Sequence, residues 1–180
     1  MKTRFMKLAG HAAWAFFFAL TACGRTSSDD ELEKLFRDHE KEFVELKDRS
    51  TRAGVIEMIT PTEIRTDTEF VKLNGRLPSD LPNNTESKLS AAEWRSHFSL
   101  MKNLSVQMVF RDAKNSDVTL KIQAESLSNG DSTKGIAYLE SPPAPVVPEL
   151  DSYKPTSTDS HGSFTAYKHI SGNWYLYFAR

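Results

Sequence analysis

The first 22 residues have the pattern of a leader, distinct from the part of the chain that can fold as a domain. Lys2, Arg4 and Lys7 make its start positive, and the 13 residues from Leu8 to Leu20 are mostly apolar. A helix of that length rises about 20 Å, whereas the hydrocarbon core of a bilayer is about 30 Å thick. A basic start, a short apolar run and small residues are the layout of a secretory signal peptide. We therefore predict that residues 1–22 are removed and take no part in the fold.

The leader ends in Leu20-Thr21-Ala22-Cys23. This ending resembles the bacterial lipobox, in which a small residue precedes a cysteine at the cleavage point. In lipoproteins of that family the cysteine thiol carries a diacylglycerol, and a dedicated peptidase cleaves just before it. The resemblance covers residues 1–23 and implies cleavage between Ala22 and Cys23, with lipidation of Cys23. The alternative is an ordinary cleaved signal peptide in which the cysteine occurs by chance.

Cys23 is the only cysteine in the chain. An exported protein with one cysteine cannot form an internal disulfide, and acylation would use the thiol that is otherwise free. Two or three acyl chains anchor a protein stably, whereas one chain is marginal. In the lipoproteins that this segment resembles, an aspartate after the cysteine favours the inner membrane. Gly24 therefore implies a lipid anchor on the periplasmic face of the outer membrane, with the bilayer as the first partner.

Cleavage would leave residues 23–180, enough for one domain of ordinary size. The leader holds three positive charges and no negative ones, so the net charge of −1 becomes −4 in the mature chain. This mild acidity argues against a nucleic-acid partner, which requires clustered Lys and Arg. Residues 23–28 give the lipidated cysteine and a tether of at most about 17 Å. We predict a single α+β globular domain over residues 29–180, held close to the membrane.

Two helices are predicted from capping boxes and from apolar residues at helical spacing. Ser28 and Glu31 form the first box, and the helix that it opens extends to about Arg52, with Gly54 as its stop. A short coiled coil is the alternative for this helix. Ser90 and Glu93 form the second box, and its helix extends to about Asn103. The apolar stripe of the first helix consists of Leu32, Leu35, Phe36, His39, Phe43 and Leu46.

Alternating apolar residues and turn signals predict the strands. The predicted strands cover 55–66 with a break at Pro61, 70–73, 106–110, 118–124, about 134–140, 164–170 and 173–178. The last two form a hairpin with a turn at Ser171-Gly172, and the final strand is apolar enough to be covered on both faces. The order of elements predicts the α+β class, with both helices packed on one face of a curved, mainly antiparallel sheet. This arrangement is loosely similar to the cystatin-like and nuclear-transport-factor-like folds.

The sequence contains no motif for a cofactor, and its histidines are too scattered for a metal site. We therefore predict no cofactor, no metal and no catalytic residue. Asp159-Ser160-His161 has the residue types of a hydrolase triad, but triad members meet through the fold rather than as neighbours. Glu57 and Glu63, on either side of Pro61, are the remaining candidates for a pair of carboxylates.

Aromatic and polar residues gather in the last strands and in the proline-rich segment 141–162. If they share one sheet face, they would form a concave surface suited to a protein partner or an amphipathic ligand. The alternative is that they only cap the edge of the core. This possible binding surface consists of Tyr138, Tyr153, Tyr167, His169, Tyr175 and Tyr177.

Three functions remain open from the sequence. The first is a non-enzymatic binding protein of the cell envelope, which contacts another envelope protein or blocks an incoming one, as immunity-type lipoproteins do. The second is a carrier of a small amphipathic ligand, which requires an internal pocket of several hundred Å³. The third is a hydrolase, which requires a histidine and a carboxylate within hydrogen-bond reach inside one cleft.

Overall fold

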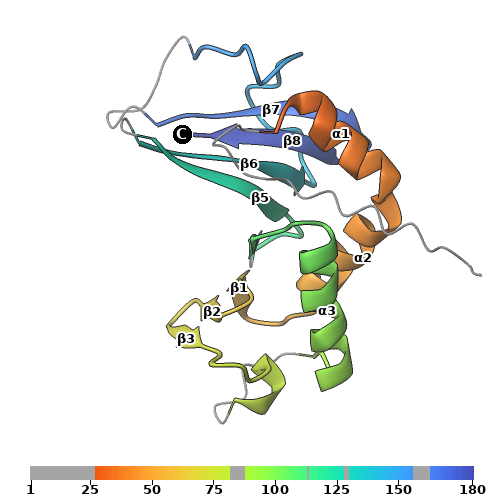
Figure 1. Ribbon diagram of the computed structural model, residues 1–180, viewed down its shortest axis with the longest axis vertical. Helices are drawn as coiled ribbons and strands as arrows, with labels where there is room; N and C mark the ends of the chain where they lie inside the picture. The colour runs from red at the N-terminus through yellow and green to blue at the C-terminus, as the bar shows by residue number, and fades with distance from the viewer. Residues whose placement is uncertain (1–26, 82–87, 113, 128–129, 156–162) are drawn as a thin grey trace, which may run out of the picture.

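A computed structural model describes residues 27–81, 88–112, 114–127, 130–155 and 163–180. Within these ranges the fold is α+β, with three α-helices, a short 3₁₀-helix and one open antiparallel sheet (Figure 1). The leader, Cys23 and the Asp159-Ser160-His161 candidate lie outside the described residues. The helices are α1 (Asp29–Asp38), α2 (Glu40–Thr51) and α3 (Ala91–Asn103), and η1 (Pro78–Asp80) is the 3₁₀-helix.

The sheet has eight strands in the order β3-β2-β1-β4-β5-β6-β8-β7, and all neighbouring strands are antiparallel. Strand β8 therefore lies inside the sheet, beside the edge strand β7, as its apolar run predicts. The strands are β1 (Ile56–Ile59), β2 (Glu63–Thr66), β3 (Phe70–Lys72), β4 (Met108–Arg111), β5 (Val118–Leu127), β6 (Gly130–Tyr138), β7 (Thr165–Ser171) and β8 (Trp174–Ala179).

The first predicted helix is two helices in the structure. The helical spacing of apolar residues continues through the break, so the pattern does not reveal it. At His39 the backbone leaves helical geometry (φ −129°, ψ 26°). The change of direction lets Phe36 of α1 and Phe43 of α2 both contact Trp174 of β8, with ring centroids 5.2 and 6.5 Å apart. The prediction of two helices was therefore wrong in number, because one break brings both halves of the stripe onto the same tryptophan.

Both predicted capping boxes are present. The Glu31 backbone N–H donates to Ser28 Oγ at 3.2 Å, and the Ser28 N–H donates to Glu31 Oε2 at 2.8 Å. The same reciprocal pair joins Ser90 and Glu93 at the start of α3. Side chains thus satisfy backbone donors that the first helical turn leaves without partners.

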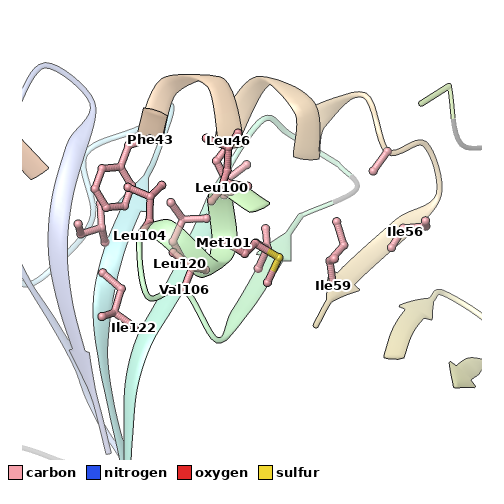
Figure 2. Packing of buried hydrophobic residues seen from close by; sticks show 14 of the residues in the cluster. Phe43, Leu46, Ile56, Ile59, Leu100, Met101, Leu104, Val106, Leu120 and Ile122 are labelled. Carbon is pink, nitrogen blue, oxygen red and sulfur yellow. The ribbon is translucent and has the colours of Figure 1, made fainter. Parts of the chain in front are cut away.

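Figure 2 shows the core where α2, α3 and the first strands of the sheet meet. Helix α3 contacts α2 and η1, and α2 contacts β4 and β5. The side chains that fill this region are at most 8% exposed, so they form one packed layer rather than separate clusters. They include Phe43, Leu46, Ile56, Ile59, Leu100, Met101, Leu104, Val106, Leu120 and Ile122.

Two threonines close the hairpins of the first three strands. Thr60 Oγ1 accepts hydrogen bonds from the N–H groups of Thr62 and Glu63. Thr66 Oγ1 accepts the equivalent bonds from Thr68 and Glu69. Both threonine side chains are buried. Pro61 lies inside the first of these turns, which explains how one strand-like stretch becomes the separate strands β1 and β2.

The turn predictions differ in accuracy. Asn74 (φ 49°) and Gly75 (φ 78°) occupy the left-handed region and close a turn in which the Arg76 N–H donates to the Leu73 carbonyl oxygen. The β7–β8 turn lies at Gly172 and Asn173, one residue later than predicted, because Ser171 still pairs with Trp174.

In the described part of the chain, no helix has the length and hydrophobicity needed to span a membrane.

Candidate functional site

The register of β6, β7 and β8 assigns the predicted aromatic residues to two faces of the sheet. Directly opposed residues in an antiparallel pair project to the same side. Tyr177 lies opposite Tyr167, and Tyr175 lies opposite His169. We call the side that carries these four residues the tyrosine face. The other side of β8 carries Trp174, and we call it the Trp174 face.

Tyr175 contacts two of the other side chains of the tyrosine face. The Tyr175 ring lies edge-on to Tyr167 and to His169, with centroids 6.5 and 5.3 Å apart. His169 Nε2 lies 3.0 Å from the Gly172 carbonyl oxygen, which fixes the imidazole at the hairpin end. Tyr175 and Tyr177 are only 6% and 5% exposed, whereas Tyr167 is half-buried and His169 is exposed. A partner at this face would therefore meet Tyr167 and His169 first.

Tyr177 lies across Gly135 of β6. A Cβ built on Gly135 would be 2.8 Å from Tyr177 Cε1 and 2.1 Å from the Leu120 carbonyl oxygen. The ring thus occupies the space that any other residue at position 135 would need. Burial, and to a smaller extent the neighbouring Tyr167, raise the pKa of Tyr177 above its ordinary value. Burial followed by the charge of Asp117 raises the pKa of Tyr167 as well. Both phenols are therefore neutral hydrogen-bonding groups at physiological pH.

We expect Gly135→Ala to lower the free energy of unfolding by about 1–3 kcal/mol, because the added methyl group requires the backbone of β5 and the Tyr177 ring to move. Urea unfolding followed by tryptophan fluorescence measures the effect. Gly172→Asn is the matched control. Position 172 has a positive φ, which Asn adopts more readily than most residues, and no atom lies within 4 Å of a built Cβ, so its substitution should cost clearly less than that of Gly135. Equal effects of the two substitutions would contradict the close approach at Gly135.

Tyr138 and Tyr153 do not lie on the tyrosine face. Tyr138 lies opposite Trp174 in the β6–β8 register, and its ring is edge-on to that of Trp174 at 5.3 Å. Lys47 Nζ lies 4.5 Å from the centre of the Tyr138 ring. Tyr153 contacts Phe164 at 6.1 Å, beside Phe178. The structure thus brings four of the six predicted residues together and separates the other two from them.

Each of these two tyrosines borders a cavity. The cavity at Tyr138 has a volume of about 470 Å³ and opens between the end of α2 and the ends of β5 and β6. Its lining is mostly charged or hydroxylated, with Lys47, Asp48, Arg52 and Glu140 among the residues. The cavity at Tyr153 is smaller, about 230 Å³, and includes Lys134 and Asp151. The larger cavity has the volume of a small-ligand site, but its charged lining differs from the apolar walls typical of such sites.

The most distinctive polar arrangement in the described residues is a buried network of charges where α1 begins. We call it the N-terminal ion cluster. Asp29 is 1% exposed and Lys134 is 2% exposed, and the Lys134 ammonium lies 2.6 Å from Asp29 Oδ1. The cluster consists of Asp29, Glu33, Lys134, Glu149, Asp151 and Lys168, contributed by α1, β6, β7 and the segment after β6.

Hydrogen bonds fix the chain on both sides of Asp29. Lys134 Nζ donates to the Ser27 carbonyl oxygen at 3.1 Å and to Asp151. The Asp29 N–H donates to Asp151 Oδ2 at 2.9 Å, and the Leu150 N–H donates to Asp29 Oδ2 at 2.7 Å. The Asp29 carboxylate also lies in the first turn of α1, where the helix dipole favours negative charge. The described chain is thus attached to the sheet from its first residues onward.

Lys168 is the second cation of the cluster. Its Nζ lies 2.8 Å from Glu33 Oε1 and 3.6 Å from Asp29 Oδ2. Burial acts to lower the pKa of Lys168, but the bond to Glu33 and the surrounding carboxylates outweigh it and raise that pKa to about 12. The hydrogen bond from Lys168 in turn lowers the pKa of Glu33. Lys168 and Glu33 are therefore both charged at neutral pH.

The same cluster contains the one arrangement of carboxylates in the described ranges that could approach a metal ion. Single oxygens of Asp29, Glu149 and Asp151 lie within 4.8 Å of one another. The ammonium groups of Lys134 and Lys168 contact these same carboxylates and supply the positive charge that a metal would bring. The chemistry of the arrangement is therefore that of a structural ion network.

The remaining sequence candidates do not form a cleft with opposed acid and base. Glu57 pairs with Arg65 at 3.6 Å, and Glu63 lies opposite Lys72 in the β2–β3 register. His39 Nδ1 lies 3.5 Å from Glu42 Oε1, one turn away on the surface of α2. This contact joins half-exposed side chains on the surface of the helix.

Comparison of the chain with protein-family models, with curated proteins and with solved structures gives no match. The functional argument therefore rests on this chain alone.

Sequence reasoning missed several buried polar groups, among them Lys134 and His97. Lys134 lies in a predicted strand, where a lysine ordinarily reaches solvent. His97 is 0% exposed in α3, and in the described structure neither of its ring nitrogens has a hydrogen-bond partner. The spacing of His97 from Trp94 and Met101 places it on the predicted buried side of the helix, and this was the available signal. For Lys134 no local signal exists, because its partners come from distant segments.

Proposed function

We propose that this chain is a lipid-anchored protein on the periplasmic face of the outer membrane, attached through acylated Cys23. Its domain would act as a non-enzymatic binding or immunity-type protein. The observation that carries the proposal is the N-terminal ion cluster. Lys134 and Asp151 hold Ser27 and Asp29 against the sheet, so the chain is attached to the domain four residues after Cys23. Those four residues span at most about 14 Å, so an acylated Cys23 would keep the domain at the bilayer surface.

We further propose that the helices cover one face of the sheet and leave the tyrosine face for a protein partner. Contacts of Phe36 and Phe43 with Trp174 support the first part. The second part is supported by the half-buried Tyr167 and the exposed His169, which border the buried Tyr175 and Tyr177. Aromatic residues are enriched in protein interfaces because they offer a large apolar surface with one polar group.

The test has two measurements on the full-length chain expressed in a bacterium with a lipoprotein pathway. We expect Cys23→Ala either to leave the membrane pellet for the soluble fraction or to keep its leader uncleaved, because the acylated thiol is lost. Ser27→Ala is the matched control, since it keeps both the cysteine and the backbone carbonyl that Lys134 binds. A membrane-bound Cys23→Ala chain with its leader removed would contradict the anchor.

The second measurement addresses the binding face. Envelopes are solubilised in mild detergent, and proteins that copurify with the chain are compared between Tyr167→Ser and Thr51→Ser. The first substitution alters the tyrosine face, and the second is exposed on α2. We expect a specific partner to be retained with Thr51→Ser and reduced with Tyr167→Ser. Equal recovery of every copurifying protein with both variants would exclude this face as the partner surface.

A further inference from the structure

The two edge strands of the sheet differ in whether another segment of the described chain hydrogen-bonds to them. At the β7 edge, the segment around Val146 adds a short parallel bridge. There the Val147 N–H donates to the Tyr167 carbonyl oxygen at 2.7 Å, and the Tyr167 N–H donates to the Pro145 carbonyl oxygen at 3.0 Å. At the other edge, β3 has a pairing partner on the β2 side only, as far as the described residues go. Figure 1 shows β3 at the opposite end of the sheet from α1 and β7.

The hydrogen-bond pattern determines which main-chain groups of β3 face outward. The Thr66 N–H donates to the Glu69 carbonyl oxygen, and the Leu73 N–H donates to the Thr62 carbonyl oxygen. Hydrogen-bonded pairs alternate along an antiparallel ladder, so Val71 directs its main-chain groups toward β2. Phe70 and Lys72 therefore direct theirs away from the sheet. The β2–β3 ladder contains no bulge that would turn this edge aside.

The side chains at this edge are unusual for a strand that stays solvated. Phe70 is 65% exposed, the highest fraction among the large hydrophobic residues of the described chain. The Arg65 guanidinium lies 5.7 Å from its ring and 5.9 Å from that of Phe110. An exposed apolar residue on an uncovered edge is a site for the addition of another strand.

We propose that β3 pairs with β3 of a second copy of this chain, antiparallel and about a two-fold axis at Val71. This register places Phe70 and Lys72 of one copy opposite Lys72 and Phe70 of the other, and both pairs are hydrogen-bonded. Val71 lies opposite its own equivalent in the non-hydrogen-bonded pair between them. The eight-stranded sheets of the two copies then continue into one another.

The side chains of β3 are complementary to those of a second β3, which selects a second copy as the partner. The directly opposed side chains on one face follow one another across four strands: Arg65 and Phe70 belong to one copy, and Lys72 and Glu63 to the other. Each lysine thus meets an aromatic ring and keeps its own glutamate beside it, and no like charges are directly opposite. Shifting the register by two residues in one direction places the two Lys72 side chains opposite each other. A shift in the other direction places the two Phe70 side chains opposite each other. Either shift leaves two of the three β3 residues without a β3 residue opposite, so the register about Val71 is the one that pairs the whole strand.

Cross-linking tests the register. Residues in a non-hydrogen-bonded pair have Cα atoms about 4.5 Å apart, within the range that a disulfide requires. We expect Val71→Cys in the full-length, membrane-bound chain to give a reducible dimer on mild oxidation. Val44→Cys on α2 is the matched control, because Val44 is also exposed (37%) and lies away from β3. No dimer from Val71→Cys, or an equal amount from Val44→Cys, would overturn the proposal.

A charge exchange at Phe70 tests the pairing independently of any cysteine at the interface. Phe70→Lys places a lysine opposite Lys72 of the other copy, whereas Phe70→Glu places a glutamate there. Both variants lose the same exposed ring. We expect self-association of the detergent-solubilised full-length chain, measured by sedimentation, to be about tenfold weaker for Phe70→Lys than for Phe70→Glu. Equal association of the two variants would show that paired strands are not the contact, and thermal unfolding confirms that both are folded.

Discussion

Lys134→Met is expected to lower the free energy of unfolding by about 3–5 kcal/mol at neutral pH, the range for removing one partner of a buried ion pair. The methionine fills nearly the same volume, so the main change is electrostatic. Asp29, which is 1% exposed, loses its contact at 2.6 Å and keeps Lys168 only at 3.6 Å. The Ser27 carbonyl oxygen and Asp151 also lose a donor.

The measurement is urea unfolding followed by the fluorescence of Trp94 and Trp174. Lys154→Met is the matched control, because Lys154 is exposed and its loss should change the free energy by no more than about 0.5 kcal/mol. Adding Asp29→Asn to Lys134→Met removes the uncompensated carboxylate. The double variant should therefore lose less than the two single losses combined. A loss below about 1 kcal/mol for Lys134→Met would show that the N-terminal ion cluster does not hold α1 to the sheet.

Local sequence patterns gave the helix starts and most strands correctly, because those features depend on neighbouring residues. Ser28 with Glu31 and Ser90 with Glu93 begin helices in the structure as the capping pattern predicts. The nearly continuous apolar run of β8 likewise predicts that it is buried on both sides. The break at His39 is different, because helical spacing continues across it. Its position depends on how Phe36 and Phe43 reach Trp174, which is a contact between distant segments.

The candidate surface was predictable only within single strands. Alternation places Tyr175 and Tyr177 on one side of β8 and Trp174 on the other. Whether Tyr138 joins the tyrosines depends on the β6–β8 register, and that register places it with Trp174. The order of strands that brings β8 between β6 and β7 is likewise not encoded in any short stretch. The sequence therefore identified the residue types of the surface but could not assign each residue to a face.

The N-terminal ion cluster was beyond sequence reasoning for the same reason. Asp29 and Asp151, which share a hydrogen bond, are 122 positions apart, and Ser27 and Lys134 are 107 apart. Taken alone, Lys134 resembles a solvated strand residue and Asp29 an ordinary first-turn acid. Only the packing of α1 on β6 and β8 reveals that both are buried. The lipid-anchor proposal also depends on this contact, because it attaches the chain to the sheet at Ser27 and so sets the length of the tether from Cys23.

The stability of the protein is expected to fall by about 2.5 kcal/mol between pH 7 and pH 4.5 because of His97 alone. Burial, followed by the charge of Arg49, lowers the pKa of His97 from 6.5 to about 3. Its ring lies among aromatic neighbours, 5.3 Å from Trp94 and 5.9 Å from Phe98. Neither ring nitrogen has a hydrogen-bond partner among the described residues, so nothing there compensates a charge on the imidazole.

The sign follows from the two pKa values. Below pH 6.5 the unfolded chain binds a proton on His97 that the folded chain does not bind until about pH 3. The unfolded state therefore gains free energy by protonation, and stability falls by about 1.4 kcal/mol per pH unit in that window. The lowered carboxylate pKa values act in the same direction. Their effects begin only near the unfolded values, 4.5 for Glu33 and Glu93 and 3.8 for Asp151.

The range between pH 6.5 and 5 thus isolates the histidine. Urea unfolding at several pH values should give a clear slope for the unsubstituted chain and almost none for His97→Leu. His39→Gln is the control that keeps the slope, since His39 is half-exposed at the α1–α2 break. At pH 7, His97→Leu should be at least as stable as the unsubstituted chain, because it removes two buried nitrogens without partners. Parallel slopes for the unsubstituted chain and His97→Leu would contradict the lowered pKa of His97, because they would mean that folding does not change its protonation.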